Sequence, residues 1–75
     1  MSAVAVRVKQ IEDFSMFVDV LGALGRIAGV VEAHAVRFQD NAGVFEVTVA
    51  APLTPTALIS QAERTLRRPV RFSGI

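Results

Sequence analysis

The 75-residue sequence contains no cysteine, no tryptophan and no tyrosine. Without cysteine the chain cannot form a disulfide, a thiolate metal site or a thiol redox centre. An excess of one charge is also missing, because eight lysine and arginine residues face seven acidic ones and the formal net charge is +1. This balance provides no general attraction to nucleic acid or to an anionic membrane.

Long hydrophobic runs are missing as well. A membrane-spanning helix needs about 20 consecutive apolar residues, and Asp19 and Arg26 interrupt the most apolar stretch, residues 16–31. Residues 1–4 lack the charged and apolar regions of a signal peptide, so we expect a cytoplasmic protein without membrane contact. Hydrophobic residues make up 52% and charged residues 20% of the chain. These values indicate one folded domain, residues 1–75.

Alternating apolar and polar residues predict strands at residues 4–8, 30–38, 44–50 and 70–72. In the second of these, Phe38 points inward only if the alternation slips near Val36 and Arg37, which predicts a bulge there. Residues 39–43, "QDNAG", are typical of a hairpin turn. The outward face of the sheet is then expected to carry the polar members of the strands: Arg7, Glu32, His34, Glu46, Thr48 and Arg71.

Two helices separate these strands. Asp13 is suited to cap a helix that runs to about Ala28, followed by Gly29. Thr54 and Pro55 are typical of the start of a second helix, which Pro69 ends. The resulting order, β-α-β-β-α-β, predicts a ferredoxin-like α+β sandwich with a four-stranded antiparallel sheet and both helices on one face.

Three segments, "LGRIAGVVEAHAV", "NAGVFEVTV" and "LTPTALISQAERTL", resemble the heavy-metal-associated domain, the copper-chaperone-like ferredoxin fold. That family holds metal with the cysteines of a Met-x-Cys-x-x-Cys loop after the first strand. The corresponding loop here reads "KQIEDFS", and monovalent copper prefers thiolate ligands. The resemblance therefore implies the scaffold without metal transfer, and the same scaffold also carries ACT-like sensing modules and protein-binding modules.

Catalysis is not expected. Glu12 and Asp13 are explained by helix capping, and no serine has a histidine or aspartate at a known motif spacing. His34, the single histidine, is interpreted as an exposed polar residue; a pH-responsive contact or one ligand of an intermolecular metal site is the alternative. We therefore predict no catalytic, cofactor-binding or metal-binding residues.

Four arginines, Arg64, Arg67, Arg68 and Arg71, lie close together near the C-terminus. They are the candidates for anion or nucleic-acid contacts, and a solvated helix end is the favoured interpretation. Sheet-based RNA-binding modules stack bases on exposed aromatic residues. All five phenylalanines here fall at inward or helical positions, so binding to nucleic acid is disfavoured.

The first helix is apolar over roughly 220° of its circumference at about 100° per residue, far more than a surface helix requires. We expect its core stripe to be Phe17, Leu21, Leu24 and Ala28. One remaining flank has the 4-3-4 spacing of a helix-to-helix seam and is the candidate interface: Met16, Val20, Ala23 and Ile27. The other flank is a line of small residues: Val18, Gly22, Gly25 and Gly29.

These observations favour a non-catalytic module for protein–protein interaction, with a homodimer preferred among homo-oligomers and the first helix as its contact. A regulatory or assembly role is expected by analogy. Two alternatives stay open at this stage. Both flanks of the helix could be buried within one chain, or the domain could sense a small ligand in the ACT-like manner, at a dimer interface near "KQIEDFS".

Overall fold

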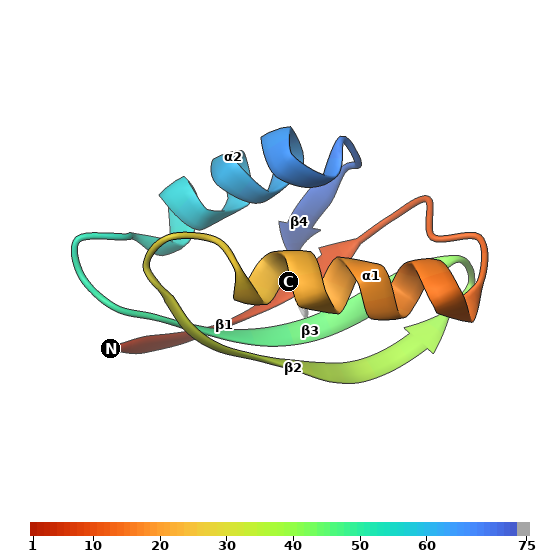
Figure 1. The fold of residues 1–75 in the computed structure, drawn as a ribbon, viewed down its shortest axis with the longest axis horizontal. Coiled ribbons are helices and arrows are strands. Elements are labelled where there is room, and N and C mark those ends of the chain that lie inside the picture. The colour runs from red at the N-terminus through yellow and green to blue at the C-terminus, as the bar shows by residue number, and fades with distance from the viewer. Residues whose placement is uncertain (74–75) are drawn as a thin grey trace.

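The computed structural model describes residues 1–73, which form a β-α-β-β-α-β sandwich. Its sheet has the strand order β2-β3-β1-β4, and all neighbouring pairs are antiparallel. Figure 1 shows both helices on one face of this sheet, so the predicted ferredoxin-like fold is confirmed. The elements are β1 (Ser2–Val8), α1 (Phe14–Gly25), β2 (Val30–Gln39), β3 (Ala42–Val49), α2 (Pro55–Leu66) and β4 (Val70–Phe72).

Both predicted helix caps are confirmed. The Asp13 side chain accepts a hydrogen bond of 2.8 Å from the Met16 amide, and the Thr54 hydroxyl accepts one of 3.1 Å from the Ala57 amide. These bonds satisfy amide groups that have no partner within the helix.

Helix α1 ends at Gly25, three residues before the predicted Ala28. The amides of Arg26 and Ile27 bond to carbonyls three residues back, at Ala23 and Leu24. This tighter turn ends the α-helix. Ile27, which follows it, lies in the core and is 6% exposed.

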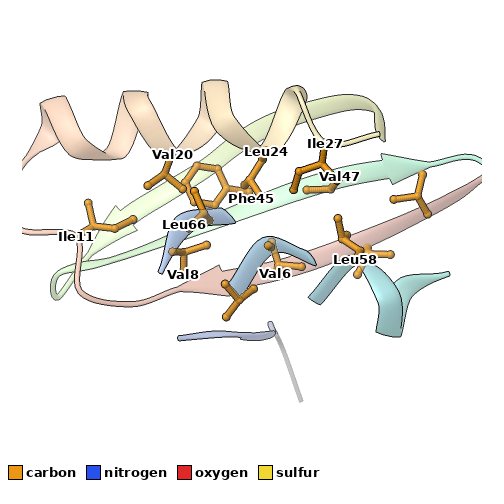
Figure 2. Packing of buried hydrophobic residues seen from close by; sticks show 14 of the residues in the cluster. Val6, Val8, Ile11, Val20, Leu24, Ile27, Phe45, Val47, Leu58 and Leu66 are labelled. Atoms are coloured by element: carbon orange, nitrogen blue, oxygen red, sulfur yellow. The ribbon is translucent and has the colours of Figure 1, made fainter. Parts of the chain in front are cut away.

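The core lies between the sheet and the two helices, and Figure 2 shows its central residues. The apolar side of the strands supplies Val6, Val8, Phe45 and Val47, and α2 supplies Leu58, Ala62 and Leu66. Phe17 stacks at 5.0 Å, centroid to centroid, on Phe45. This close packing requires a glycine beneath the rings, because a Cβ atom at Gly43 would lie 2.8 Å from both Phe17 and Phe45.

Strand β2 contains two bulges. Its pairing with β3 shifts register between Val30 and Glu32 and again between Ala35 and Arg37. The second shift confirms the slip predicted from the sequence, and Phe38 turns inward after it. The residue inserted at each shift, Val31 or Val36, is among the most exposed large apolar residues of the chain, at 57% and 58%.

The β2–β3 turn is tighter than the predicted five residues. Gln39 pairs with Ala42, so only Asp40 and Asn41 form the loop. Both have positive φ values, 55° and 59°, which is the geometry of a type I′ turn. Aspartate and asparagine adopt this conformation more readily than most residues.

Candidate interaction surfaces

The structure corrects the orientation predicted for α1. Val20 and Ile27 of the predicted interface flank are only 2% and 6% exposed, and Met16 and Ala23 are half-buried. Thr65 and Leu66 of α2 line the same shallow hollow as Met16, Val20 and Ala23. The second helix of the same chain therefore covers this flank, and Val20 and Ile27 are not available to a partner.

The predicted core stripe is also rotated. Phe17 and Leu24 are buried as expected, but Leu21 is half-buried and Ala28 is exposed. Val20 and Ile27 take their places in the core. The buried side of α1 is thus the side that carries Val20, rotated about the helix axis from the side that was predicted.

The opposite flank of α1 is the exposed one. Phe14 and Val18 are 65% and 48% exposed, and with Leu21 and Gly25 they have the same 4-3-4 spacing. A Cβ atom added at Gly25 would meet nothing within 4 Å. Gly25 therefore does not serve close packing within the chain.

Phe14 is held in place although its ring is exposed. It lies 5.7 Å from the ring of Phe17, which in turn stacks at 5.1 Å on Phe38 and at 5.0 Å on Phe45. Aromatic pairs at such separations contribute about 0.5–1.5 kcal/mol beyond the burial of area. The exposed ring is therefore supported from the core rather than loosely attached.

Next to this flank runs an open sheet edge. β2 is ten residues long and is the outermost strand of the described sheet on its side, whereas the other edge strand, β4, has three residues. Helix α1 packs on β2, with their directions opposed (Figure 1). We call the exposed α1 flank (Phe14, Val18, Leu21 and Gly25) together with the free edge of β2 the edge surface.

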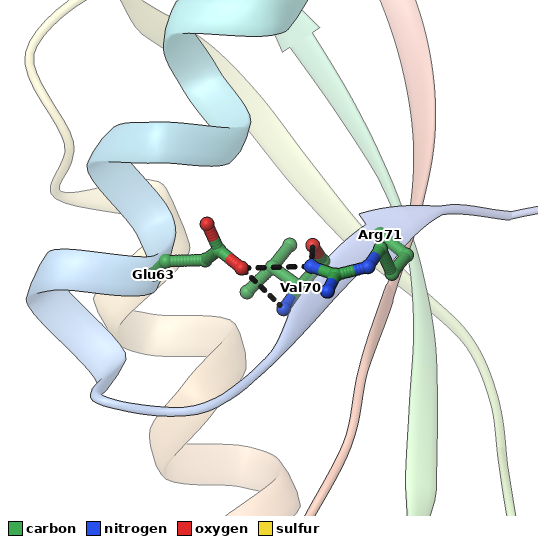
Figure 3. A network of polar contacts seen from close by, with 3 residues as sticks. All are labelled: Glu63, Val70 and Arg71. Atoms are coloured by element: carbon green, nitrogen blue, oxygen red, sulfur yellow. Dashed lines mark hydrogen bonds and ion pairs between the residues drawn. The ribbon is translucent and has the colours of Figure 1, made fainter.

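Most of the C-terminal arginines are engaged within the chain. Arg71 forms a 2.9 Å ion pair with Glu63, whose same oxygen accepts a 3.4 Å hydrogen bond from the Val70 amide (Figure 3). Arg68 donates to the carbonyls of Gln10 and Leu66 at 3.2 and 3.0 Å, and Arg64 donates to Gln61 at 3.4 Å. The Glu63 contacts join α2 to β4, and the Arg68 contact joins the segment after α2 to the β1–α1 loop. Three of the four predicted contact residues therefore have structural partners.

The single histidine, His34, has one acidic partner, on its own strand. His34 lies 3.0 Å from Glu32 on the outward face, and both side chains are more than half exposed. Within residues 1–73, no group of three or more histidine or acidic residues is placed to hold a metal ion. No helix in the same range is long and apolar enough to cross a membrane.

A hollow of about 670 Å³ adjoins the "KQIEDFS" loop. Loop residues Gln10 and Glu12 line it together with Asn41 of the β2–β3 turn, whose carbonyl accepts a 2.9 Å hydrogen bond from the Ile11 amide. Arg67 and Arg68 contribute charge, and Met16 and Leu66 contribute apolar surface. Both polar and apolar groups therefore converge at this end of the molecule.

The outward face of the sheet carries a row that the sequence analysis recognised only in part. The register places Arg37, Val44, Arg7 and Arg71 side by side across the four strands. Val44 is only 7% exposed although it lies on this open face. Arg37 was missed because its direction depends on the bulge at Val36, and Val44 was missed because its cover comes from neighbouring strands.

Comparisons with protein-family descriptions and with curated proteins find no match. Among solved structures, one described as concerning crosstalk between Cu(I) and Zn(II) homeostasis has a TM-score of 0.72 and 19% identity, covering 96% of this chain and 99% of that chain. The solution structure of a yeast copper transporter domain, in apo and Cu(I)-loaded states, has a TM-score of 0.68 and 14% identity, covering 93% and 92%. At these identities the likeness establishes the fold. The resemblance predicted from the sequence is thus confirmed as a shared fold, in a chain without cysteine.

Proposed function

We propose that this domain is a non-catalytic protein–protein interaction module that forms a homodimer through the edge surface. The observation that carries the proposal is the coincidence of two unpartnered features on one side of the molecule. One is the apolar α1 flank, with Phe14 65% and Val18 48% exposed. The other is the ten-residue open edge of β2, and unpaired strand edges readily pair with another chain.

A second copy of the chain fits this surface by symmetry. A two-fold axis across the middle of β2 would pair β2 with its symmetry mate in the antiparallel direction. Because α1 packs along β2 on one face of the sheet, an axis perpendicular to the sheet would also place the two α1 flanks side by side and antiparallel. Isologous contacts of this kind use one patch twice and close at the dimer.

Sedimentation velocity over a micromolar concentration series tests this proposal. The unmodified chain should form a dimer, and Val18→Glu should raise the dissociation constant at least about tenfold, because a charge is then buried in each half of the contact. Val18 is not part of the core cluster, so the variant should remain folded by circular dichroism.

Ser60→Glu is the matched control, since Ser60 is an exposed residue of α2 away from the edge surface. It adds the same charge and should leave dimerisation unchanged. A chain that stays monomeric throughout the concentration series, or equal weakening by both substitutions, would refute the proposal.

A small-ligand sensor is the second candidate, and the hollow beside "KQIEDFS" is the observation that favours it. Charged and apolar groups line it together, which is a combination typical of small-molecule sites. This candidate predicts that an amino acid or nucleotide raises the melting temperature of the domain. No shift with either class of compound would count against it.

A further inference from the structure

The outward face of the sheet holds two arginines without an ionic partner in the described part of the chain. Arg7 and Arg37 are both exposed, and the ion pairs found within residues 1–73 involve neither of them. Arg71, their neighbour in the same row, is instead drawn toward α2 by Glu63. Arg7 and Arg37 are therefore the two cations of this row that are free to bind another group.

Their placement on the sheet is convergent. Each is paired in register with Val44, from opposite sides, so their Cα atoms are two strand spacings apart, about 10 Å. Val44 is 7% exposed, which shows that atoms from its neighbours cover it. The two arginines line a hollow of about 150 Å³ together with Val44, Gln39, Asp40 and Ala42.

We propose that this hollow binds a compact oxyanion, such as a phosphate group, between the guanidinium groups of Arg7 and Arg37. A phosphate monoester carries about 1.5–2 negative charges at pH 7, which matches two cations. Planar guanidinium groups bind such oxyanions through paired hydrogen bonds. This inference concerns the outward face of the sheet and does not depend on dimerisation through the edge surface.

The surroundings favour a small ligand over nucleic acid. The aromatic residues of β2 and β3, Phe38 and Phe45, lie on the helix-covered face, so in the described sheet they offer no platform for base stacking on the outward face. Asp40, which also lines the hollow, adds one negative charge. A long polyanion would have to pass this carboxylate, whereas a single phosphate between the arginines would meet it only at one side.

Titration of the ¹⁵N-labelled chain with inorganic phosphate and pyrophosphate, followed by NMR, tests the proposal. The amides of Arg7, Arg37 and Val44 should shift together and saturate. Arg7→Gln and Arg37→Gln should each weaken binding about tenfold or more, the usual cost of a lost hydrogen bond to a charged group. Asp40→Asn should strengthen binding, by about threefold, because it removes a like charge.

Two further variants separate a site from a general positive field. Arg37→Lys keeps the charge but loses the planar donor pair, so it should weaken binding severalfold. Arg26→Gln, at the exposed residue that follows α1, removes the same charge elsewhere and should have no effect.

Several results would overturn the proposal: no saturable shift with either anion, equal effects of Arg26→Gln and Arg37→Gln, unchanged binding by Arg37→Lys, or weaker binding by Asp40→Asn. Much tighter binding of a single-stranded oligonucleotide at the same amides would also overturn it, in favour of nucleic acid. A phosphorylated peptide is a separate arm of the titration. Binding no tighter than that of inorganic phosphate assigns the site to the free anion, and contacts beyond the hollow would refute a compact ligand.

Discussion

Replacement of Gly43 by alanine tests how tightly the stacked rings of Phe17 and Phe45 pack against β3. Gly43 lies in β3, where a glycine normally costs about 0.5–1 kcal/mol relative to alanine. The substitution would therefore stabilise the chain if there were room. There is none, because the new Cβ would lie 2.8 Å from ring atoms of both Phe17 and Phe45.

Overpacking of this kind costs about 1–3 kcal/mol, which exceeds the gain from replacing glycine. We expect Gly43→Ala to lower the free energy of unfolding by about 1–2 kcal/mol. In a domain of this size that corresponds to a fall in melting temperature of roughly 5–15 °C. Phe14 rests on Phe17, so the displaced ring should also weaken dimerisation.

Gly25→Ala is the matched control. The added Cβ would meet nothing within 4 Å, and alanine is favoured over glycine in a helix by up to about 1 kcal/mol. Thermal unfolding monitored by circular dichroism should therefore show opposite shifts for the two variants. A neutral or stabilising Gly43→Ala would refute the steric argument. In the double variant Gly43→Ala/Phe17→Leu, failure to recover part of the loss would show that the clash is not with Phe17.

Two other substitutions test the interactions that define the element ends. Asp13→Ala should lower the free energy of unfolding by about 1 kcal/mol in urea denaturation, because the Met16 amide loses its acceptor; Glu12→Ala, one residue earlier, is the control and should be nearly neutral. Glu63→Ala should lower the free energy of unfolding by no more than about 1 kcal/mol, since the ion pair between Glu63 and Arg71 is partly exposed. A loss of several kcal/mol would show that the connection between α2 and β4 depends on this pair far more than its exposure implies.

The elements of the fold could be predicted because their signals are local. Alternation in β1 and β3, the caps Asp13 and Thr54, and the slip at Val36 are all read within a few residues. Each was found where expected. Neighbouring residues are enough to distinguish helix from strand when polar and apolar residues follow a clear periodicity.

The orientation of α1 could not be predicted in the same way. The helix is apolar on both flanks, so hydrophobicity alone does not decide which flank faces α2. The decision depends on α2, which lies some 30 residues later in the chain and occupies the side of Met16 and Val20. The burial of Val44 has a similar cause, since its neighbours Arg7 and Arg37 come from two other strands.

The two bulges of β2 limit how far its free edge can be extended. Removal of Val31 and Val36 would leave an uninterrupted register with β3, because their neighbours already pair with consecutive residues of that strand. The inserted valines thus divide a long strand into short straight pieces, and only Glu32–Ala35 lies between them. An incoming strand would find only this short regular segment, Glu32–Ala35, between the two bulges, which suits one matching copy and discourages a growing stack. A chain that lacks both valines would present a flat edge along the whole length of β2. We expect such a chain to stay folded and to assemble into fibres.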